Sequence, residues 1–170
     1  MSRIRDDYPE LLDKVSAIDF ARLAAFIDGE GTIYINMPYK NYGRAKGPQH
    51  RLCVLVSNTD PRLMEWLKST FDGCVYIVRN TKSSNPLGKK RVMHWQVNER
   101  MAMHLLEHIL PFMLLKRQQA EIGLAFMKLK KTRAQTGTPL TDDEIAQRQG
   151  MKFAISGLNK GSGIPLETIQ

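Results

Sequence analysis

The chain has 170 residues, of which 42% are hydrophobic and 25% charged, the composition of an ordinary globular protein large enough for a core of its own. No apolar run approaches the ~20 residues that a membrane-spanning helix needs, and the first residues lack the apolar segment of a signal peptide. We therefore expect an intracellular protein with no membrane partner. The net charge of +8 favours a polyanionic partner.

The first predicted elements are a short helix, a longer helix and a strand. Ser16 followed three residues on by Asp19 resembles the capping box that opens a long helix. That helix is expected to end at Gly29, because glycine tolerates the positive φ that stops a helix. Glu30 then lies in a tight turn between two glycines, and the alternating residues 32–37 predict a half-buried strand.

The rest of the chain continues with strands and helices. Asp60 followed by Pro61 predicts an N-cap with proline at the first helical position. Four strands with helices on one side form an α+β layer pair whose other face is open. The remaining predicted elements are strands over about 51–58, 74–79 and 92–97, and helices over about 61–72, 99–110, 112–131 and 141–158.

Two faces of the long helix differ in side-chain size. Phe20, Leu23 and Ile27 have the spacing of a core-facing stripe. The other face is made of small residues, and it lets a second helix pack closely, since the distance between helix axes depends on the side chains between them. Its simplest partner is the same helix in a second copy around a twofold axis. The predicted dimer interface consists of Ala21, Ala24, Ala25 and Asp28.

The basic charge is concentrated in the predicted strand pairs. Residues 32–59 and 73–98 contain no Asp or Glu, whereas both stretches contain lysines and arginines. A solvated basic surface is the simplest interpretation of one such run. Two acid-free strand pairs favour a face that binds nucleic acid.

The stretch from Leu23 to Gly31, LAAFIDGEG, resembles the motif that names the LAGLIDADG homing endonucleases, in the single-motif form that acts as a homodimer. It departs from the motif at Ala25, Phe26 and Glu30, and the last exchange moves the carboxylate one methylene further out. The resemblance implies an α+β fold with an αββαββα core. In that core a four-stranded antiparallel sheet, backed by helices, forms a saddle over double-stranded DNA.

The resemblance also implies a metal-dependent active site. Two Glu30 carboxylates brought together by the dimer, helped by the Gly29 carbonyl, would hold Mg²⁺, with Mn²⁺ as an alternative and Ca²⁺ as a substitute that does not support cleavage. Lys116 lies in a stretch similar to the family's segment with an active-site lysine, and a cation there would stabilise charge on the phosphate. Asp60 stands at a further catalytic position of the family, although it also suits a helix N-cap.

Structural roles are the alternatives at each of these positions. Glu30 also suits a tight turn, and Asp28 is either a second metal ligand or, as we prefer, a hydrogen-bond acceptor at the dimer interface. The candidate lysine also suits a solvated helix, with Arg117 as another carrier of the charge. Met64 replaces an arginine that the family can have, an exchange for which Arg62 is a candidate substitute.

Strand alternation and loop charge predict the DNA contacts. Alternate residues of each strand point to the open face, where they suit base contacts, while cations in loops and at strand ends suit phosphates. A slip of one residue would reverse the faces of a strand. The strand candidates are Thr32, Tyr34, Asn36, Arg51, Cys53, Ser57, Tyr76, His94 and Gln96, and the phosphate candidates are Lys40, Arg44, Lys46, Arg79, Lys82, Lys89, Lys90 and Arg91.

Two short patterns and a cysteine pair point to other chemistry. His104, Glu107 and His108 match the H-x-x-E-H pattern of inverted zinc peptidases, but the pattern is short and lacks a dedicated third ligand. Residues 144–159 resemble a helix-turn-helix, yet a continuous helix fits the apolar positions better. The cysteines are expected to be free, buried thiols in a reducing compartment, with a disulfide between Cys53 and Cys74 as an alternative.

The chain is divided into an N-terminal extension (1–15), an endonuclease core (16–131) and a C-terminal helical extension (132–170). The expected function is a homing endonuclease that makes metal-dependent double-strand breaks in a long pseudo-palindromic DNA target. Its compartment would contain DNA, as bacterial or archaeal cytoplasm and some organelles do. Two alternatives stay open: an RNA-splicing maturase on the same scaffold, with its own intron RNA as partner, and a non-catalytic DNA-binding regulator.

Overall fold

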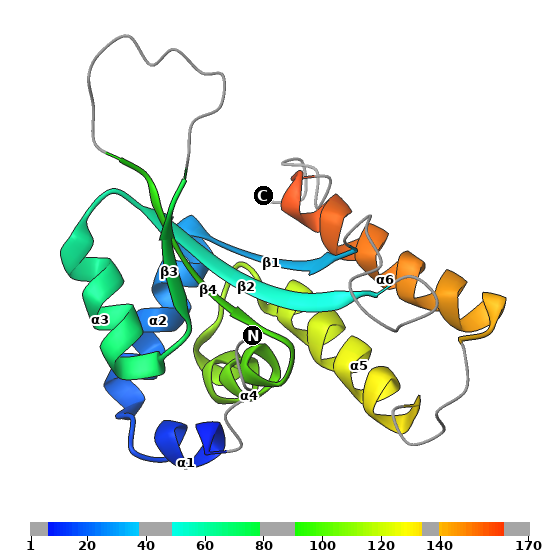
Figure 1. The fold of residues 1–170 in the computed structure, drawn as a ribbon, viewed down its shortest axis with the longest axis horizontal. Helices are drawn as coiled ribbons and strands as arrows, with labels where there is room; N and C mark the ends of the chain where they lie inside the picture. The colour runs from blue at the N-terminus through cyan, green and yellow to red at the C-terminus, as the bar shows by residue number, and fades with distance from the viewer. Residues whose placement is uncertain (1–6, 38–48, 79–90, 134–139, 162–170) are drawn as a thin grey trace, which may run out of the picture.

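The computed structural model describes residues 7–37, 49–78, 91–133 and 140–161 (Figure 1). Within the described part of the chain, no helix is both long and apolar enough to cross a membrane. The α+β order αββαββα, predicted for the core, is present from α2 to α4. The elements are α1 (Tyr8–Leu12), α2 (Ala17–Glu30), β1 (Gly31–Asn36), β2 (Arg51–Asn58), α3 (Pro61–Phe71), β3 (Cys74–Ile77), β4 (Met93–Asn98), α4 (Glu99–Ile109), the 3-10 helix η1 (Leu110–Phe112), α5 (Arg117–Arg133) and α6 (Asp142–Asn159).

The strands form one antiparallel sheet in the order β1-β2-β4-β3. The register pairs Tyr34 with Cys53, Cys53 with Asn98, and Tyr76 with His94. Paired residues of antiparallel strands place their side chains on the same face, so the alternate residues that were predicted to be open share one face. The opposite face carries the apolar residues.

The core lies between that apolar face and the helices. Ile33, Val54 and Trp95 of the sheet are fully buried, as are Leu23 of α2 and Leu105 of α4. Helices α2, α4 and α5 contact β2, and Figure 1 shows α4 and α5 beneath the sheet. The sheet is therefore covered on one side, and its other face is available to a partner.

Both terminal segments add to the same core. Tyr8 and Leu12 of α1 and Ile155 of α6 are buried in the hydrophobic cluster that includes the sheet. Helix α6 is continuous and contacts β1 and α5, so the prediction of a continuous helix is confirmed and the helix-turn-helix alternative is wrong. Asn159 Nδ2 donates to the carbonyl of Ile33, 2.8 Å away, which attaches the end of α6 to the edge strand β1.

The segment before α5 differs from the predicted helix over 112–131. A short 3-10 helix contains Pro111, Met113 is extended, and α5 begins at Arg117. Proline has no N–H to donate. The N–H groups of Leu114 and Lys116 donate to the Asp28 carboxylate of α2, so they make no bonds within a helix. The predicted helix is therefore interrupted by a loop that passes the end of α2.

Candidate functional site

Glu30 is the last residue of α2, and it does not lie in the predicted turn. The expected positive φ is also absent: Gly31 has φ −88°, and the positive-φ glycines of the described chain are Gly73 and Gly161. Gly31 is needed for space instead, because a Cβ there would lie 2.6 Å from the Cα of Ile27. The helix thus runs directly into β1, which places the carboxylate where helix and sheet meet.

The Glu30 carboxylate is exposed and has one hydrogen-bonded oxygen. Asn58 Nδ2 donates to its Oε2 at 2.5 Å, and no described residue donates to its Oε1. A carboxylate at the negative end of a helix dipole increases the attraction for a cation. Carboxylate and carbonyl oxygens are the donors that Mg²⁺ prefers, so the chemistry of this helix end fits the implied ion.

One subunit supplies only part of such a metal site. The described residues contain no group of three or more His, Cys, Asp or Glu able to hold a metal ion. Gly29, the second predicted ligand, lies in the last turn of α2, where carbonyl oxygens lack intrahelical partners. Further oxygens would have to come from phosphate, water or a second copy of the chain.

Asp28 has a structural role within its own subunit. Its Oδ2 accepts the N–H of Leu114 at 2.7 Å, and its Oδ1 accepts the N–H of Lys116 at 2.8 Å. The preference for a hydrogen-bond acceptor over a metal ligand agrees with this geometry. Its place at the dimer interface stays a prediction, because these bonds to the loop before α5 leave the residue half-buried.

Lys116 caps the C-terminus of α2. Its Nζ donates to the carbonyl of Asp28 at 2.7 Å and to that of Ile27 at 2.8 Å, and the Ile27 carbonyl also accepts the backbone N–H of Gly31. Burial lowers the pKa of this lysine, and the nearby Asp28 carboxylate opposes that shift. The ammonium is thus held within the helix turn that carries Glu30. Arg117, the alternative carrier, pairs with Glu121 instead.

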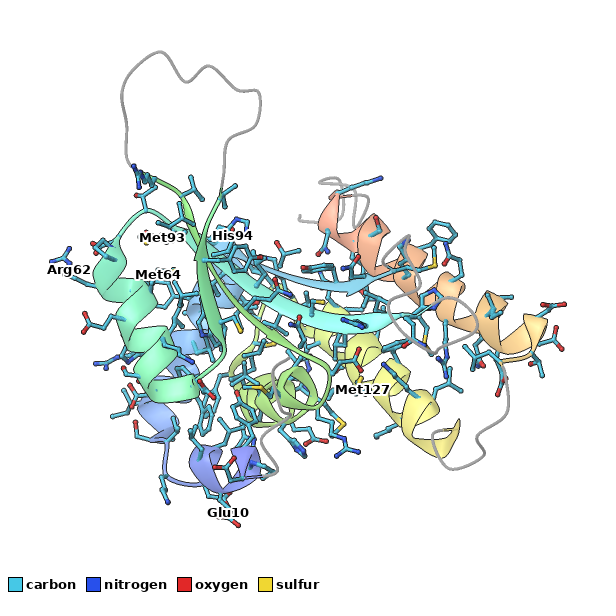
Figure 2. The ribbon with its side chains drawn as sticks, viewed as in Figure 1. Glu10, Arg62, Met64, Met93, His94 and Met127 are labelled. Atoms are coloured by element: carbon cyan, nitrogen blue, oxygen red, sulfur yellow. The ribbon has the colours of Figure 1, made fainter. Side chains whose placement is uncertain are left out.

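Asp60 is the N-cap of α3, as its sequence context predicts. Its Oδ1 accepts the backbone N–H of Arg62 at 2.9 Å, and its carboxylate pairs with the guanidinium of the same residue. Figure 2 shows Arg62 extending away from α3, while Met64 is only 2% exposed and belongs to the core. Arg62 is therefore committed to Asp60 in this structure, and the catalytic role of Asp60 stays a prediction.

Fewer small residues of α2 are exposed than predicted, and apolar residues of the loop before α5 add to the exposed surface. Ala24 is fully buried in its own subunit, so its predicted place in a dimer interface is wrong. Ala25 is exposed and Ala21 half-buried, and a Cβ on Gly29 would meet nothing within 4 Å. Besides these small residues, large apolar side chains are exposed: Ile18 (65%), Phe26 (36%), Leu114 (82%) and Leu115 (70%).

The open face of the sheet carries most of the predicted strand contacts. Tyr76 donates its hydroxyl to Gln96 at 2.8 Å, Gln96 donates to Asn98 at 2.5 Å, and His94 (Figure 2) lies 3.4 Å from the same hydroxyl. Every residue of the strands themselves is uncharged or basic. The face therefore offers linked donors and acceptors without a carboxylate. Sharing this face by register are Thr32, Tyr34, Asn36, Arg51, Ser57, Tyr76, His94 and Gln96.

Cys53 shares this face but cannot contact a ligand on it. It is 2% exposed, beside its register partner Tyr34, and burial raises the pKa of its thiol to about 11. Its prediction as a DNA contact is wrong for that reason. Both cysteines are free, so the disulfide alternative is wrong as well, and Cys74 is exposed where a buried thiol was expected.

Arg91 is exposed two residues before β4. The other predicted phosphate contacts lie outside the described residues: Lys40, Arg44, Lys46, Arg79, Lys82, Lys89 and Lys90.

The histidines of the H-x-x-E-H pattern take part in packing and local bonds of α4. His108 lies with Nδ1 2.8 Å from the carbonyl of His104, and its ring stacks on Phe20 with 5.0 Å between centroids. His104 Nδ1 lies 3.2 Å from Glu107 Oε2. These contacts give the residues of the pattern a structural role in α4.

Sequence reasoning missed Asn58. It ends β2 on the side of the sheet that faces the helices, and its amide joins Glu30 to the N–H of Asp60. The available signal was a polar residue continuing the inward series Leu52, Val54 and Val56, two positions before an N-cap.

No protein-family model matches the chain, and no curated protein matches it in sequence. Solved structures do match it. They include the homing endonuclease I-CvuI in complex with its target (19% identity, TM-score 0.62, 84% of this chain and 82% of that chain). The archaeal intron-encoded homing endonuclease I-Vdi141I, complexed with DNA, is 12% identical with a TM-score of 0.61 over 83% of this chain and 84% of that one. The LAGLIDADG meganuclease I-AabMI, bound to uncleaved DNA, is 18% identical with a TM-score of 0.58 over 87% of this chain and 46% of that one.

These similarities define the architecture first as an α+β fold with an open antiparallel sheet backed by helices. More closely, the chain has the fold of the LAGLIDADG homing endonucleases, the family whose motif residues 23–31 resemble.

Proposed function

We propose that this chain is a site-specific homing endonuclease that makes metal-dependent double-strand breaks in double-stranded DNA. The observation that carries the proposal is the Glu30 carboxylate, exposed at the end of α2 with one oxygen bonded to Asn58. It lies where the helix enters a sheet whose open face is free of acidic residues. The fold similarity to DNA-bound homing endonucleases supports the same conclusion.

The proposed active form is a homodimer that reads a long pseudo-palindromic site. Exposed Leu114 and Leu115 belong to the loop whose backbone is bonded to Asp28, so they lie near the end of α2. Exposed apolar surface of this kind is typical of an interaction site. The chain also matches only 46% of I-AabMI, which leaves room in that longer chain for a second unit of similar size.

The proposed roles follow from the contacts at the end of α2. Glu30 supplies a hard oxygen ligand from each subunit, and Gly29 a carbonyl oxygen. A bound Mg²⁺ or Mn²⁺ would activate water and stabilise the leaving oxygen of the phosphodiester. Lys116 holds the last turn of the helix through the carbonyls of Ile27 and Asp28, and its charge would stabilise the charge that develops on the phosphate. The open sheet face holds bases, while loop cations hold phosphates.

The test uses Glu30→Gln, with Glu65→Gln on the exposed side of α3 as the matched control. A duplex selected from a random library should be cleaved by the parent in Mg²⁺ or Mn²⁺ and only bound in Ca²⁺. Glu30→Gln should lower the cleavage rate by about 100-fold or more, the size of effect expected for a group that stabilises developing charge. Binding without cleavage by the parent would favour the regulator, and intron splicing without DNA cleavage would favour the maturase. The proposed compartment is intracellular and contains DNA.

A further inference from the structure

Asn58 joins two elements through the two ends of its side-chain amide. Its Oδ1 accepts the backbone N–H of Asp60 at 2.8 Å, and its Nδ2 donates to Glu30 Oε2 at 2.5 Å. The backbone N–H can only donate, so the amide atom facing it has to be the oxygen. The NH₂ group is then directed at the carboxylate. The turn before α3 therefore decides which way the amide points.

This bond restrains a side chain that is otherwise free to move. Glu30 is exposed at the end of its helix, and a glutamate has one more rotatable bond than an aspartate at the same place. Fixing Oε2 on Asn58 limits the positions of Oε1, to which no other described side chain donates. The bond therefore restrains the additional rotatable bond that Glu30 has in comparison with the aspartate of the motif.

The chemistry of an amide suits a neighbour of a cation site. A lysine or arginine bonded to Glu30 would bring a positive charge that competes with a metal ion for the carboxylate. The NH₂ of Asn58 is a neutral donor, so it orients the carboxylate without that repulsion. Hydrogen-bond partners that orient metal ligands in this way contribute strongly to metal affinity.

We propose that Asn58 is a positioning residue that orients the Glu30 carboxylate for a divalent cation. This inference rests on the proposed function, because it assigns Glu30 the role of metal ligand. It goes further in naming the residue that holds the ligand and in making the geometry of the site depend on the turn between β2 and α3.

The experiment titrates Ca²⁺ into the complex of the full chain with a selected duplex and measures binding by calorimetry. Asn58→Ala should raise the half-saturating Ca²⁺ concentration by about 10-fold, the lower end of the effect of removing such a partner. The Mg²⁺ concentration for half-maximal cleavage should rise by the same factor. The rate at saturating Mg²⁺ should return to within about twofold of the parent, since the ligand itself is intact.

Two further variants separate positioning from folding. Asn58→Ser keeps an oxygen that can accept the Asp60 N–H two residues on, but it is too short to reach Glu30, so it should show the same shift in metal affinity as alanine. Asn159→Ala removes another amide that joins two elements, α6 and the edge strand β1, without contacting Glu30, and should leave the Ca²⁺ titration unchanged.

The double variant with Glu30→Gln gives the decisive comparison. In that background Asn58→Ala should have no further effect on Ca²⁺ binding. An unchanged Ca²⁺ titration in both Asn58 variants, or an equal shift with and without Glu30, would overturn the inference while the parent still cleaves DNA. Failure of the proposed function would show earlier, as a parent that neither binds Ca²⁺ with DNA nor cleaves in Mg²⁺.

Discussion

Gly29→Ala gives opposite predictions for a lone subunit and for a dimer that packs through α2. A Cβ at this position would meet nothing within 4 Å in the subunit. Replacing a helical glycine by alanine then stabilises the fold by up to about 0.5 to 1 kcal/mol, because the unfolded chain loses freedom. The Gly29 carbonyl, which we propose as a metal ligand, is kept.

In the dimer the same methyl group would enter the space between two helices. Overpacking a close contact costs about 1 to 3 kcal/mol per added group, and both copies carry the change, so dimerisation should weaken by about 2 to 6 kcal/mol. At 1.4 kcal/mol per factor of ten, even the smaller figure raises the dimer Kd by about 30-fold. The substitution should therefore stabilise the monomer and dissociate the dimer.

Sedimentation equilibrium measures the dimer Kd, and urea unfolding at concentrations where the parent is monomeric measures the stability of the subunit. Gly150→Ala is the matched control, since a Cβ on that glycine of α6 also meets nothing within 4 Å. It should stabilise the subunit by a similar amount and leave the Kd unchanged. A Gly29→Ala protein with the dimer Kd of the parent would refute the proposed interface.

Three further substitutions or modifications test the local geometry. Gly31→Ala should lower the free energy of unfolding by at least about 2 kcal/mol, because its Cβ would lie 2.6 Å from the Cα of Ile27; an unchanged urea midpoint would contradict the close approach. Asp28→Asn should cost about 1 to 3 kcal/mol in thermal unfolding, since the amide puts an NH₂ where one carboxylate oxygen accepts a backbone N–H; parental stability would show that these bonds do not form. At about pH 8 a disulfide reagent should modify Cys74 at once and Cys53 only after unfolding in guanidinium. Burial raises the pKa of the Cys53 thiol to about 11, which leaves about one thiol in 1,000 ionised at that pH. Rapid modification of two thiols per chain in the absorbance assay would refute the burial.

Local patterns in the sequence predicted the sheet well. The open-face residues alternate strictly along β1, β2 and β4, and the register brings Tyr34, Cys53 and His94 to one face as expected. A period of two leaves each strand only two choices of face, and the apolar residues select one of them. Exposure within that face was not predictable, since it depends on neighbours: Cys53 is covered on the open side.

The geometry at the end of α2, the proposed active site, depends on contacts between distant parts of the chain. Lys116 caps α2, so the helix continues past Gly29, where glycine alone predicts its end. The Asp28 carboxylate holds the backbone before α5, so the predicted helix from 112 is broken there. Both outcomes join residues more than eighty positions apart, which no pattern within a single helix or strand can predict.

The two acids at the end of α2 have separate tasks because their oxygens have different partners. Both oxygens of Asp28 accept backbone N–H groups, so its charge is used to position the loop that carries Lys116. Glu30 accepts a hydrogen bond from a neutral amide on one oxygen, and no described residue donates to its other oxygen. Removing the charge of Asp28 should therefore reduce stability first, and removing that of Glu30 should reduce cleavage first. A helix end that binds a cation needs both properties, since a ligand is only as well placed as the helix turn that carries it.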